Sequence, residues 1–477
     1  MNISILINSL VKGFKCPRCG YSGSIDIHNI ICPRCGAFFE IEYKYDELYG
    51  ALIDWSKERR LNVWAYSSLL PCSSSLSIVS LGEGGTPLVE SRHLVNGVDI
   101  FLKNEATNPT GSFLDRGATV LVSMIKEFHN LMSCAINANL AISLAAYGAK
   151  SGIRVKFFCS PEVDRGEFYQ AIALGADISV SSSQRKALID ALSVRGAYYV
   201  DSANPFLLEG EKTIAFEILE ELSWNPPLWI IIPVGTGGLL SMIWKGIKEL
   251  KMVGLIKGRL PKLVAVQAEA FSPLVDLFDG SYNRRPNETL AKDLIFFDPP
   301  KLIEAYNAIR ESKGIAIRVN DEEIVTAIKD LALNEGILAG PAAASTIAAT
   351  RKLRSEGIID KGDSVVCIIS GSGLKDPEII RIMIRQRERK YQYLSKSKLY
   401  ILQTLRYLGG KSYGYAIAKA LKEYFSIELS LPTIYHHLKE MEAMGLVRRL
   451  SIINKRIILY EITRKGMALL KEHNFST

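Results

Sequence analysis

The chain lacks the long apolar runs of a membrane protein. No apolar stretch in its 477 residues approaches the roughly 20 that a helix needs to cross a bilayer. The apolar residues 3–7 have neither a basic segment before them nor a small-residue cleavage site after them, so we do not interpret them as a secretory signal. With 48% hydrophobic and 23% charged residues, the composition is typical of a globular protein. We expect a cytoplasmic protein with no membrane partner.

Most of the chain also lacks a basic excess. From Arg385 onward lie 18 of the 58 Lys and Arg but only 7 of the 50 Asp and Glu, which leaves 40 against 43 in the first 384 residues. Basic charge confined to one end of a chain is typical of a region that binds a polyanion, nucleic acid first. The alternative is a basic tail that only aids solubility.

The length of the chain predicts about two to four domains, because a single hydrophobic core does not grow to this size. Between residues 115 and 385, strand-like apolar runs alternate with helical patterns. The strand-like runs are 155–159, 197–200, 229–233, 263–267 and 365–369, and helical patterns include 208–222, 322–333 and 343–353. This alternation predicts parallel sheets covered on both faces, with ligands at the carboxyl ends of the strands.

Four of the eight cysteines form two identical knuckles. Cys16-Pro-Arg-Cys19 and Cys32-Pro-Arg-Cys35 are separated by twelve residues, and each is followed by a glycine. Four thiolates at this spacing are typical of a closed, structural zinc site whose metal supplies the folding energy of a short segment. Redox-active pairs or disulfides are the alternatives, but no βαβ pattern surrounds the knuckles. We predict a zinc ribbon over residues 1–45 and expect the other four cysteines to be buried as small hydrophobes.

Three polar stretches, two of them rich in glycine, follow strand-like runs: residues 137–139, 234–238 and 370–377. The second leads into a helical pattern that begins at Leu239. Backbone amides at such a helix start bind anions. On its own, a loop of this kind is more often a structural turn.

Residues 108–117, NPTGSFLDRG, match the NPTGSFKDRG motif of threonine synthases at nine of ten positions. The resemblance extends over residues 12–385, including segments at 80–88 and 266–274. It implies the two-lobed α/β fold of the fold type II pyridoxal phosphate enzymes, with parallel sheets, over residues 46–385. Archaeal threonine synthases often carry an N-terminal ribbon as well.

The same resemblance implies roles for individual residues. The 235–238 loop would bind the cofactor phosphate, Asn139 would hydrogen-bond the pyridine hydroxyl group, and Ser370 would face the ring nitrogen. The expected cofactor-binding residues are Asn139, Gly235, Thr236, Gly237, Gly238 and Ser370, and the expected substrate-binding residues are Ser112, Asp115 and Arg116.

Leu114 departs from the family at the position of the Schiff-base lysine. Leucine has no nitrogen with which to hold the cofactor, exchange it with substrate or move protons. Ala138 and Gly340 are further departures at the same site. We therefore assign no catalytic residue, expect most or all activity to be lost, and expect any pyridoxal phosphate to bind without a covalent bond. Lys103 is considered as a substitute amine, and the alternative is a lysine that the family also carries at this strand end.

Residues 396–477 resemble PadR-type transcription regulators. After a basic linker at 386–395, three helical patterns at 396–408, 415–425 and 433–444 precede two strand-like runs, 446–450 and 456–462, which is the winged-helix order. The segments at 413–415 and 433–438 carry the resemblance.

In this α+β module the third helix would enter the major groove of double-stranded DNA, and the hairpin would meet phosphates. Ile434, Leu438 and Met441 are expected to pack inward. The expected DNA-binding residues are Thr433, Tyr435, His436, Lys439, Arg448, Arg449, Lys455 and Arg456. The alternative is a module used only for protein contacts or dimerisation.

Together these patterns predict a ligand-responsive, DNA-binding transcription regulator. It is built on a catalytically degenerate threonine synthase-like domain, acts as a homodimer, and binds a small anionic or amino-acid ligand. The alternative is an active threonine synthase or related lyase that acts on O-phosphohomoserine or another amino acid. A scaffold for an active relative is a third hypothesis.

Overall fold

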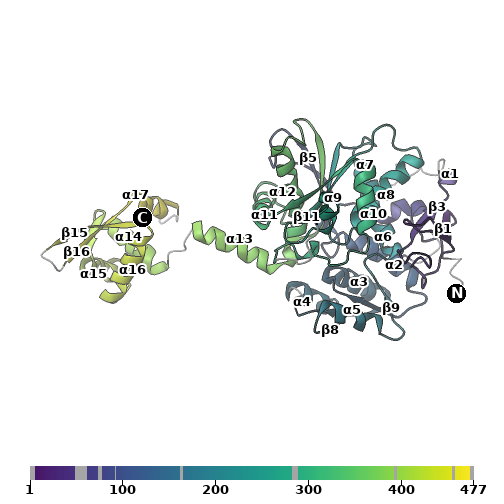
Figure 1. Cartoon of the computed structure of the whole chain (residues 1–477). Helices are drawn as coiled ribbons and strands as arrows, with labels where there is room; N and C mark the ends of the chain where they lie inside the picture. Colours follow the sequence, from purple (N-terminus) through teal and green to yellow (C-terminus); the bar gives the residue numbers. More distant parts are fainter. Residues whose placement is uncertain are drawn as a thin grey trace. The chain divides into compact units, whose positions relative to one another are not determined.

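The computed structural model describes residues 6–48, 62–73, 78–91, 93–161, 165–281, 288–390, 395–453 and 457–472. It divides into two compact units, Met1–Met383 and Ile384–Thr477 (Figure 1). Among these described residues, no helix is long and apolar enough to span a membrane.

The larger sheet of the first unit has six strands in the order β12-β11-β10-β13-β5-β4. Its strands are β4 (Leu88–Ser91), β5 (Asp99–Asn104), β10 (Trp229–Pro233), β11 (Lys262–Ala268), β12 (Ile315–Val319) and β13 (Ser364–Ile369), and its helices are α7 (Thr213–Glu221), α8 (Gly238–Met252), α9 (Pro273–Asp279), α10 (Leu302–Glu311), α11 (Asp321–Asn334) and α12 (Pro341–Ser355). All pairings are parallel except that of the edge strand β4. Helices α11 and α12 lie on one face, and α8 and α10 on the other (Figure 1). Coverage of both faces explains why β10 is buried throughout.

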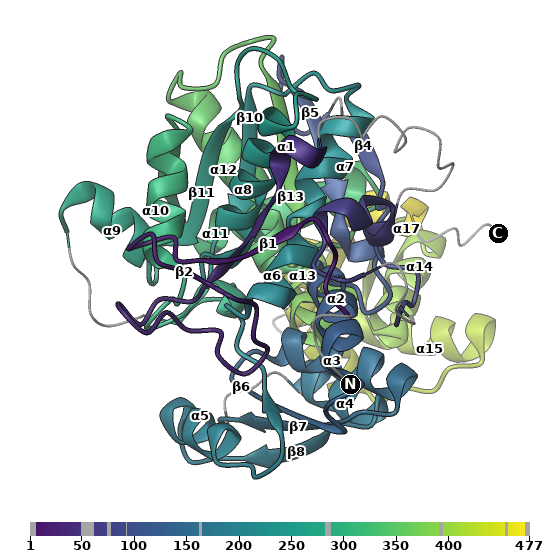
Figure 2. The same ribbon diagram turned by 90° about the vertical axis from the view of Figure 1, so that its right-hand side faces the viewer.

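The smaller lobe holds a four-stranded, wholly parallel sheet in the order β8-β7-β6-β9. Its elements are β6 (Leu131–Ala135), β7 (Arg154–Cys159), β8 (Asp177–Val180), β9 (Tyr198–Tyr199), α2 (Leu114–Ile125), α3 (Ala138–Ser151), α4 (Arg165–Ala173) and α5 (Gln184–Leu192). In Figure 2 this lobe lies below the six-stranded sheet. The two parallel sheets confirm the predicted two-lobed α/β architecture.

The predicted helix over residues 208–222 is present as two helices. These are α6 (Pro205–Glu211) and α7, which meet at Lys212. Helix α6 crosses α2 at two glycines. A Cβ atom on Gly210 would lie 1.9 Å from the carbonyl oxygen of Arg116, and one on Gly117 would lie 2.6 Å from that of Leu207. This close crossing fixes the position of α2, whose first residue is Leu114.

Gly210→Ala is expected to lower the free energy of unfolding of the first unit by about 3 kcal/mol or more, because the new methyl group meets backbone rather than a side chain that can turn away. Gly340→Ala is the matched control. Its added Cβ atom finds its nearest neighbour at 3.7 Å, so it should change stability by less than about 1 kcal/mol. Urea denaturation followed by tryptophan fluorescence measures both, and equal midpoints would contradict the expectation.

The N-terminal ribbon is a small antiparallel sheet in the order β2-β1-β3. Its strands are β1 (Val11–Lys15), β2 (Ser22–Gly23) and β3 (Glu40–Tyr43), followed by α1 (Tyr45–Leu48) and the 3₁₀ segment η3 (Val63–Leu69). The rings of Phe14 and Phe39 stack with centroids 4.9 Å apart. Strand β3 packs against α6, and Figure 2 shows the purple ribbon in front of that helix.

The second unit has three helices followed by a hairpin and a last helix. Its elements are α14 (Lys396–Tyr407), β14 (Lys411–Tyr413), α15 (Gly414–Phe425), α16 (Leu431–Ala443), β15 (Val447–Ile453), β16 (Ile457–Ile462) and α17 (Arg464–Glu472). The sheet order is β14-β16-β15, antiparallel throughout. This arrangement confirms the predicted winged helix, while residues 454–456 lie outside the described residues.

The segment expected to be a linker from residue 386 onward differs from that expectation. Helix α13 (Pro377–Lys390) continues to Lys390. Its last six residues are Arg, Gln, Glu and Lys, which favour helix and include no glycine or proline to end it. Residues 391–394 lie outside the described residues.

Candidate functional site

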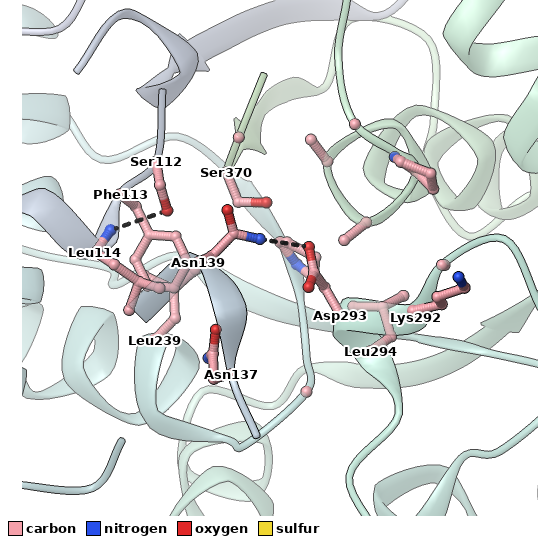
Figure 3. A pocket seen from close by; sticks show the side chains of 18 of the residues that line it. Ser112, Phe113, Leu114, Asn137, Asn139, Leu239, Lys292, Asp293, Leu294 and Ser370 are labelled. Atoms are coloured by element: carbon pink, nitrogen blue, oxygen red, sulfur yellow. Dashed lines mark hydrogen bonds between the residues drawn. The ribbon is translucent and has the colours of Figure 1, made fainter. Parts of the chain in front are cut away.

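A cleft lies at the carboxyl ends of strands β10 and β13, beside the start of α2 (Figure 3). All three of the polar stretches noted in the sequence contribute to its wall. The predicted residues that line it are Ser112, Asn139, Gly235, Thr236, Gly237 and Ser370. Gly238 does not line the cleft; it begins α8, and a Cβ atom there would lie 2.9 Å from Leu208.

The loop between β10 and α8 offers unpaired backbone amides. The N–H groups of Gly235, Thr236 and Gly237 donate to no other described residue, and α8 begins without a side-chain cap. Gly237 has a φ of +86°, a left-handed conformation that glycine adopts at little cost. Unpaired amides at the start of a 15-residue helix attract an anion. Packing contributes to the need for glycine as well, since a Cβ atom on Gly235 would lie 2.5 Å from the carbonyl oxygen of Asp293.

Asn139 and Ser370 lie around the same space from opposite lobes (Figure 3). The amide nitrogen of Asn139, in the first turn of α3, donates to Glu167 Oε1 at 2.8 Å and to Asp293 Oδ2 at 3.1 Å. The carbonyl oxygen of Ser370 accepts a hydrogen bond from the backbone N–H of Phe113 at 3.1 Å. A ligand between the two side chains would therefore contact both lobes.

Leu114 lines the cleft at the start of α2 and is only 4% exposed. Its backbone N–H donates to Ser112 Oγ at 3.3 Å (Figure 3). The leucine side chain presents only carbon to the cleft, so it can neither form an imine nor carry a proton.

Two residues expected to bind substrate, Asp115 and Arg116, do not line the cleft. The Asp115 carboxylate accepts hydrogen bonds from the backbone N–H and the hydroxyl group of Thr110, at 2.6 and 2.7 Å. The Arg116 guanidinium is fully buried and paired with Glu105 and Glu217, each at 2.6 Å. Because these partners occupy both side chains, the structure places them in the scaffold of the turn.

Lys103 does not provide a substitute amine. Its Nζ atom is fully buried and contacts Glu217 at 2.9 Å, Glu221 at 2.5 Å and the carbonyl oxygen of Thr86 at 2.6 Å. It does not line the cleft. Its ion pairs and its burial instead make it part of the scaffold of the first unit.

Lys375 is a cleft residue that sequence reasoning missed. It lines the cleft, is 8% exposed, and its Nζ atom has no hydrogen-bond partner among the described residues. Burial lowers the pKa of this amine, against the opposing influence of Glu167, Asp115 and Asp293. Its place in the 370–377 stretch was visible in the sequence, but a lysine in a polar loop is ordinarily solvated.

The sulfur atoms of Cys16, Cys19, Cys32 and Cys35 lie within 4.8 Å of one another. This confirms the predicted four-cysteine cluster. Four thiolates fit one tetrahedral metal ion, zinc above all, and leave no open position for catalysis. The remaining cysteines, at 72, 134, 159 and 367, are buried as expected.

Helix α16 of the second unit has an apolar face and an exposed face. Ile434, Leu438 and Met441 are completely buried, as predicted. His436 and Lys439 are exposed. Thr433 is half-buried, and its hydroxyl group lies 2.7 Å from that of Ser430, the residue that caps the helix.

Tyr435 differs from the other expected DNA contacts because it is packed against the module. A Cβ atom on Gly414 would lie 2.5 Å from the Tyr435 ring, so that glycine provides the space for the ring. On β15, Arg448 and Arg449 are exposed, and Arg448 pairs with Glu461 at 2.5 Å. Lys455 and Arg456 lie outside the described residues.

Comparison with known families gives two matches. Residues 79–371 match the family of pyridoxal-phosphate dependent enzymes. Residues 401–472 match the PadR-like family of transcriptional regulators. Both resemblances predicted from the sequence are thereby confirmed.

Curated relatives of the first unit include threonine synthases. That of Methanocaldococcus jannaschii is 40% identical over 379 residues, which cover 76% of this chain and 93% of the relative. That of Methanosarcina acetivorans is 39% identical over 381 residues, covering 77% and 93%.

Solved structures with a similar fold include maize serine racemase, with a TM-score of 0.54 and 19% identity over 64% of this chain and 93% of that one. Threonine deaminase isoform 2 from Solanum lycopersicum has a TM-score of 0.52 and 21% identity, over 70% and 93%. At this identity the likeness shows the fold alone.

Proposed function

Because this chain belongs to the family of pyridoxal-phosphate dependent enzymes and ends in a PadR-like module, we propose that it is a ligand-responsive DNA-binding regulator. One observation carries the proposal. The cleft keeps an anion-binding loop, Asn139 and Ser370, but presents Leu114 where the resemblance expects the Schiff-base lysine. A pocket that keeps its ligand contacts but lacks the Schiff-base lysine at its usual position suits a sensor better than a catalyst.

The residues present fit pyridoxal phosphate as a ligand. The unpaired amides of residues 235–237 suit the phosphate, while Asn139 and Ser370, which both line the cleft, would contact the ring. When bound to an amino acid, this cofactor supplies an electron sink for carbanion chemistry. Leu114 contributes only an apolar surface that excludes water.

Ligand binding would act through the two lobes of the first unit. Asn139 belongs to the lobe with β6, and the 235–237 loop to the lobe with β10. A ligand that contacts both favours the closed arrangement by its difference in affinity for the two states. In a homodimer, closure would alter the spacing of the two winged helices on DNA.

The second candidate function is a threonine synthase or related lyase that acts on O-phosphohomoserine or another amino acid. Curated threonine synthases are matched over 93% of their length, and the anion-binding loop is intact. This function requires another residue to take the place of the missing amine.

Double-stranded DNA binding tests the regulator directly. We expect the full chain to bind a fluorescent duplex at low salt. In the double variant Lys439→Ala, Arg449→Ala, the slope of the logarithm of the binding constant against the logarithm of the salt concentration should fall in magnitude by about 1.8, which is about 0.9 for each lost phosphate contact. Lys186→Ala, which removes an exposed charge paired with Asp190 in α5, is the matched control and should change nothing. Absence of binding at low salt contradicts the proposal.

A further inference from the structure

The cleft contains a buried amine that the proposed function has not yet used. Lys375 ends the short 3₁₀ segment η6 (Gly373–Lys375), which follows β13. Its side chain is more than nine-tenths buried, lines the cleft, and has no hydrogen-bond partner among the described residues. A buried and unpaired ammonium group is costly, so this position calls for a chemical explanation.

Backbone contacts bring Lys375 next to the motif that contains Leu114. The N–H of Ser372 donates to the carbonyl oxygen of Gly111 at 2.9 Å, and that of Phe113 donates to Ser370 at 3.1 Å. A Cβ atom on Gly111 would lie 3.3 Å from Cδ of Lys375. The lysine stem therefore lies against Gly111, three residues before Leu114.

The burial of Lys375 favours a reactive amine, although carboxylates lie around it. Burial, the largest influence, lowers its pKa, while Glu167, Asp115 and Asp293 oppose that change. A lysine with a lowered pKa has more of its neutral, nucleophilic form near neutral pH than a solvated lysine has. The nearby Asn139 amide, which donates to both Glu167 and Asp293, links this acidic group to the expected ring site.

We propose that Lys375 forms the covalent attachment in this cleft, to an anionic ligand that carries an aldehyde, with pyridoxal phosphate as the probe. The neutral Nζ atom attacks the aldehyde carbon, a C=N bond forms, and the aldehyde oxygen leaves as water with the two protons of the amine. No oxidant or reductant is needed. The inference rests on the proposed function in that it names the ligand class of the sensor site.

A non-reactive role for Lys375 would be to neutralise the carboxylates around it. Arginine supplies the same charge but cannot form an imine, so Lys375→Arg separates the two roles. Lys292 gives a matched control within the same cleft. Lys292 is exposed, and Figure 3 shows it on the far side of Asp293 as seen from Asn139.

The experiment incubates the full-length protein with pyridoxal phosphate at neutral pH, traps the imine with borohydride, and locates the added mass by peptide mapping. We expect the adduct on Lys375, retained in Lys292→Arg and reduced about tenfold or more in Lys375→Arg. An adduct that maps to Lys292, or that persists in Lys375→Arg, overturns the proposal. Because the adduct is also mapped on the chain without substitutions, the test remains valid even if a variant folds poorly.

DNA binding by the chain without substitutions, measured on the same protein preparation, separates the two proposals. DNA binding without an adduct on Lys375 leaves the regulator standing and overturns the attachment. An adduct on Lys375 without DNA binding overturns the regulator and leaves the covalent attachment standing.

Discussion

Cys32→Ser is expected to abolish metal binding by the ribbon and to unfold it. Structural zinc contributes about 10–16 kcal/mol to the folding of isolated four-ligand peptides at neutral pH, and a serine hydroxyl is a poor substitute for a thiolate ligand. With its four sulfur atoms within 4.8 Å of one another, the cluster has no spare ligand in reach among the described residues. The variant should therefore retain little or none of the one zinc ion per chain that we expect.

The effect should extend into the rest of the first unit, because the ribbon supplies partners to buried charges there. The Tyr43 hydroxyl group donates to Glu209 at 2.7 Å, and Lys245 Nζ donates to the carbonyl oxygen of Ile41 at 2.6 Å. At the edge of the ribbon, Arg18 pairs with Glu304 at 2.9 Å. An unfolded ribbon exposes these groups to water and leaves the core of α6 and α8 uncovered.

Metal analysis and thermal unfolding measure both consequences. Cys72→Ala is the matched control, since Cys72 is a buried cysteine of the same unit outside the cluster. This variant should keep its metal, and its free energy of unfolding should fall by only about 1–2 kcal/mol because of the small cavity. A Cys32→Ser chain that retains one metal ion and unfolds like the control would show that the cluster is not the structural site.

Local patterns made the ribbon and the winged helix predictable. The CxxC spacing fixes which sulfur atoms meet, because each knuckle closes within four residues. The third helix of the module has buried residues at 434, 438 and 441, as helical periodicity requires. In both cases the information lies within a few turns of chain.

Residues whose roles depend on distant partners were not predictable in the same way. Arg116 belongs to a substrate-site motif, yet its direction is set by Glu217, on a helix about a hundred residues later. Helical periodicity predicted that Tyr435 faces outward toward DNA. In the structure its ring packs against Gly414 instead. For Lys375 the sequence gives the loop but not its burial, which depends on hydrogen bonds to the 111–113 segment.

Arg116→Met is expected to destabilise the first unit by about 3–5 kcal/mol, because it leaves buried carboxylates without their partner. The guanidinium pairs with Glu105 and Glu217, and all three side chains are fully buried. Lys103 is the remaining cation, at 2.9 Å from Glu217. Methionine fills the volume but satisfies neither carboxylate.

The loss of stability in Arg116→Met should depend on pH in a way that identifies the buried ion pairs as its cause. Burial raises the pKa of Glu217, but Arg116 and then Lys103 outweigh it and hold the pKa at about 2. Since the pKa of an unfolded glutamate is about 4.3, the ionised Glu217 stabilises the wild-type fold above that pH, and the contribution is lost as pH falls toward 2. Without Arg116 the carboxyl group is better accommodated in its protonated form. The deficit of the variant should thus be largest at neutral pH and shrink below about pH 4.

Arg318→Met is the matched control for this loss. Arg318 also bridges two carboxylates, Asp276 and Asp279, each at 2.6 Å, but its side chain is 29% exposed. Asp279 is exposed and only Asp276 is buried, so solvent screens much of this interaction and the control should lose less than Arg116→Met at neutral pH. Urea denaturation of both variants at neutral and acidic pH decides the matter. If Arg116→Met loses no more than Arg318→Met, or if its deficit grows as pH falls, the buried charge network does not hold the 108–117 turn as we infer.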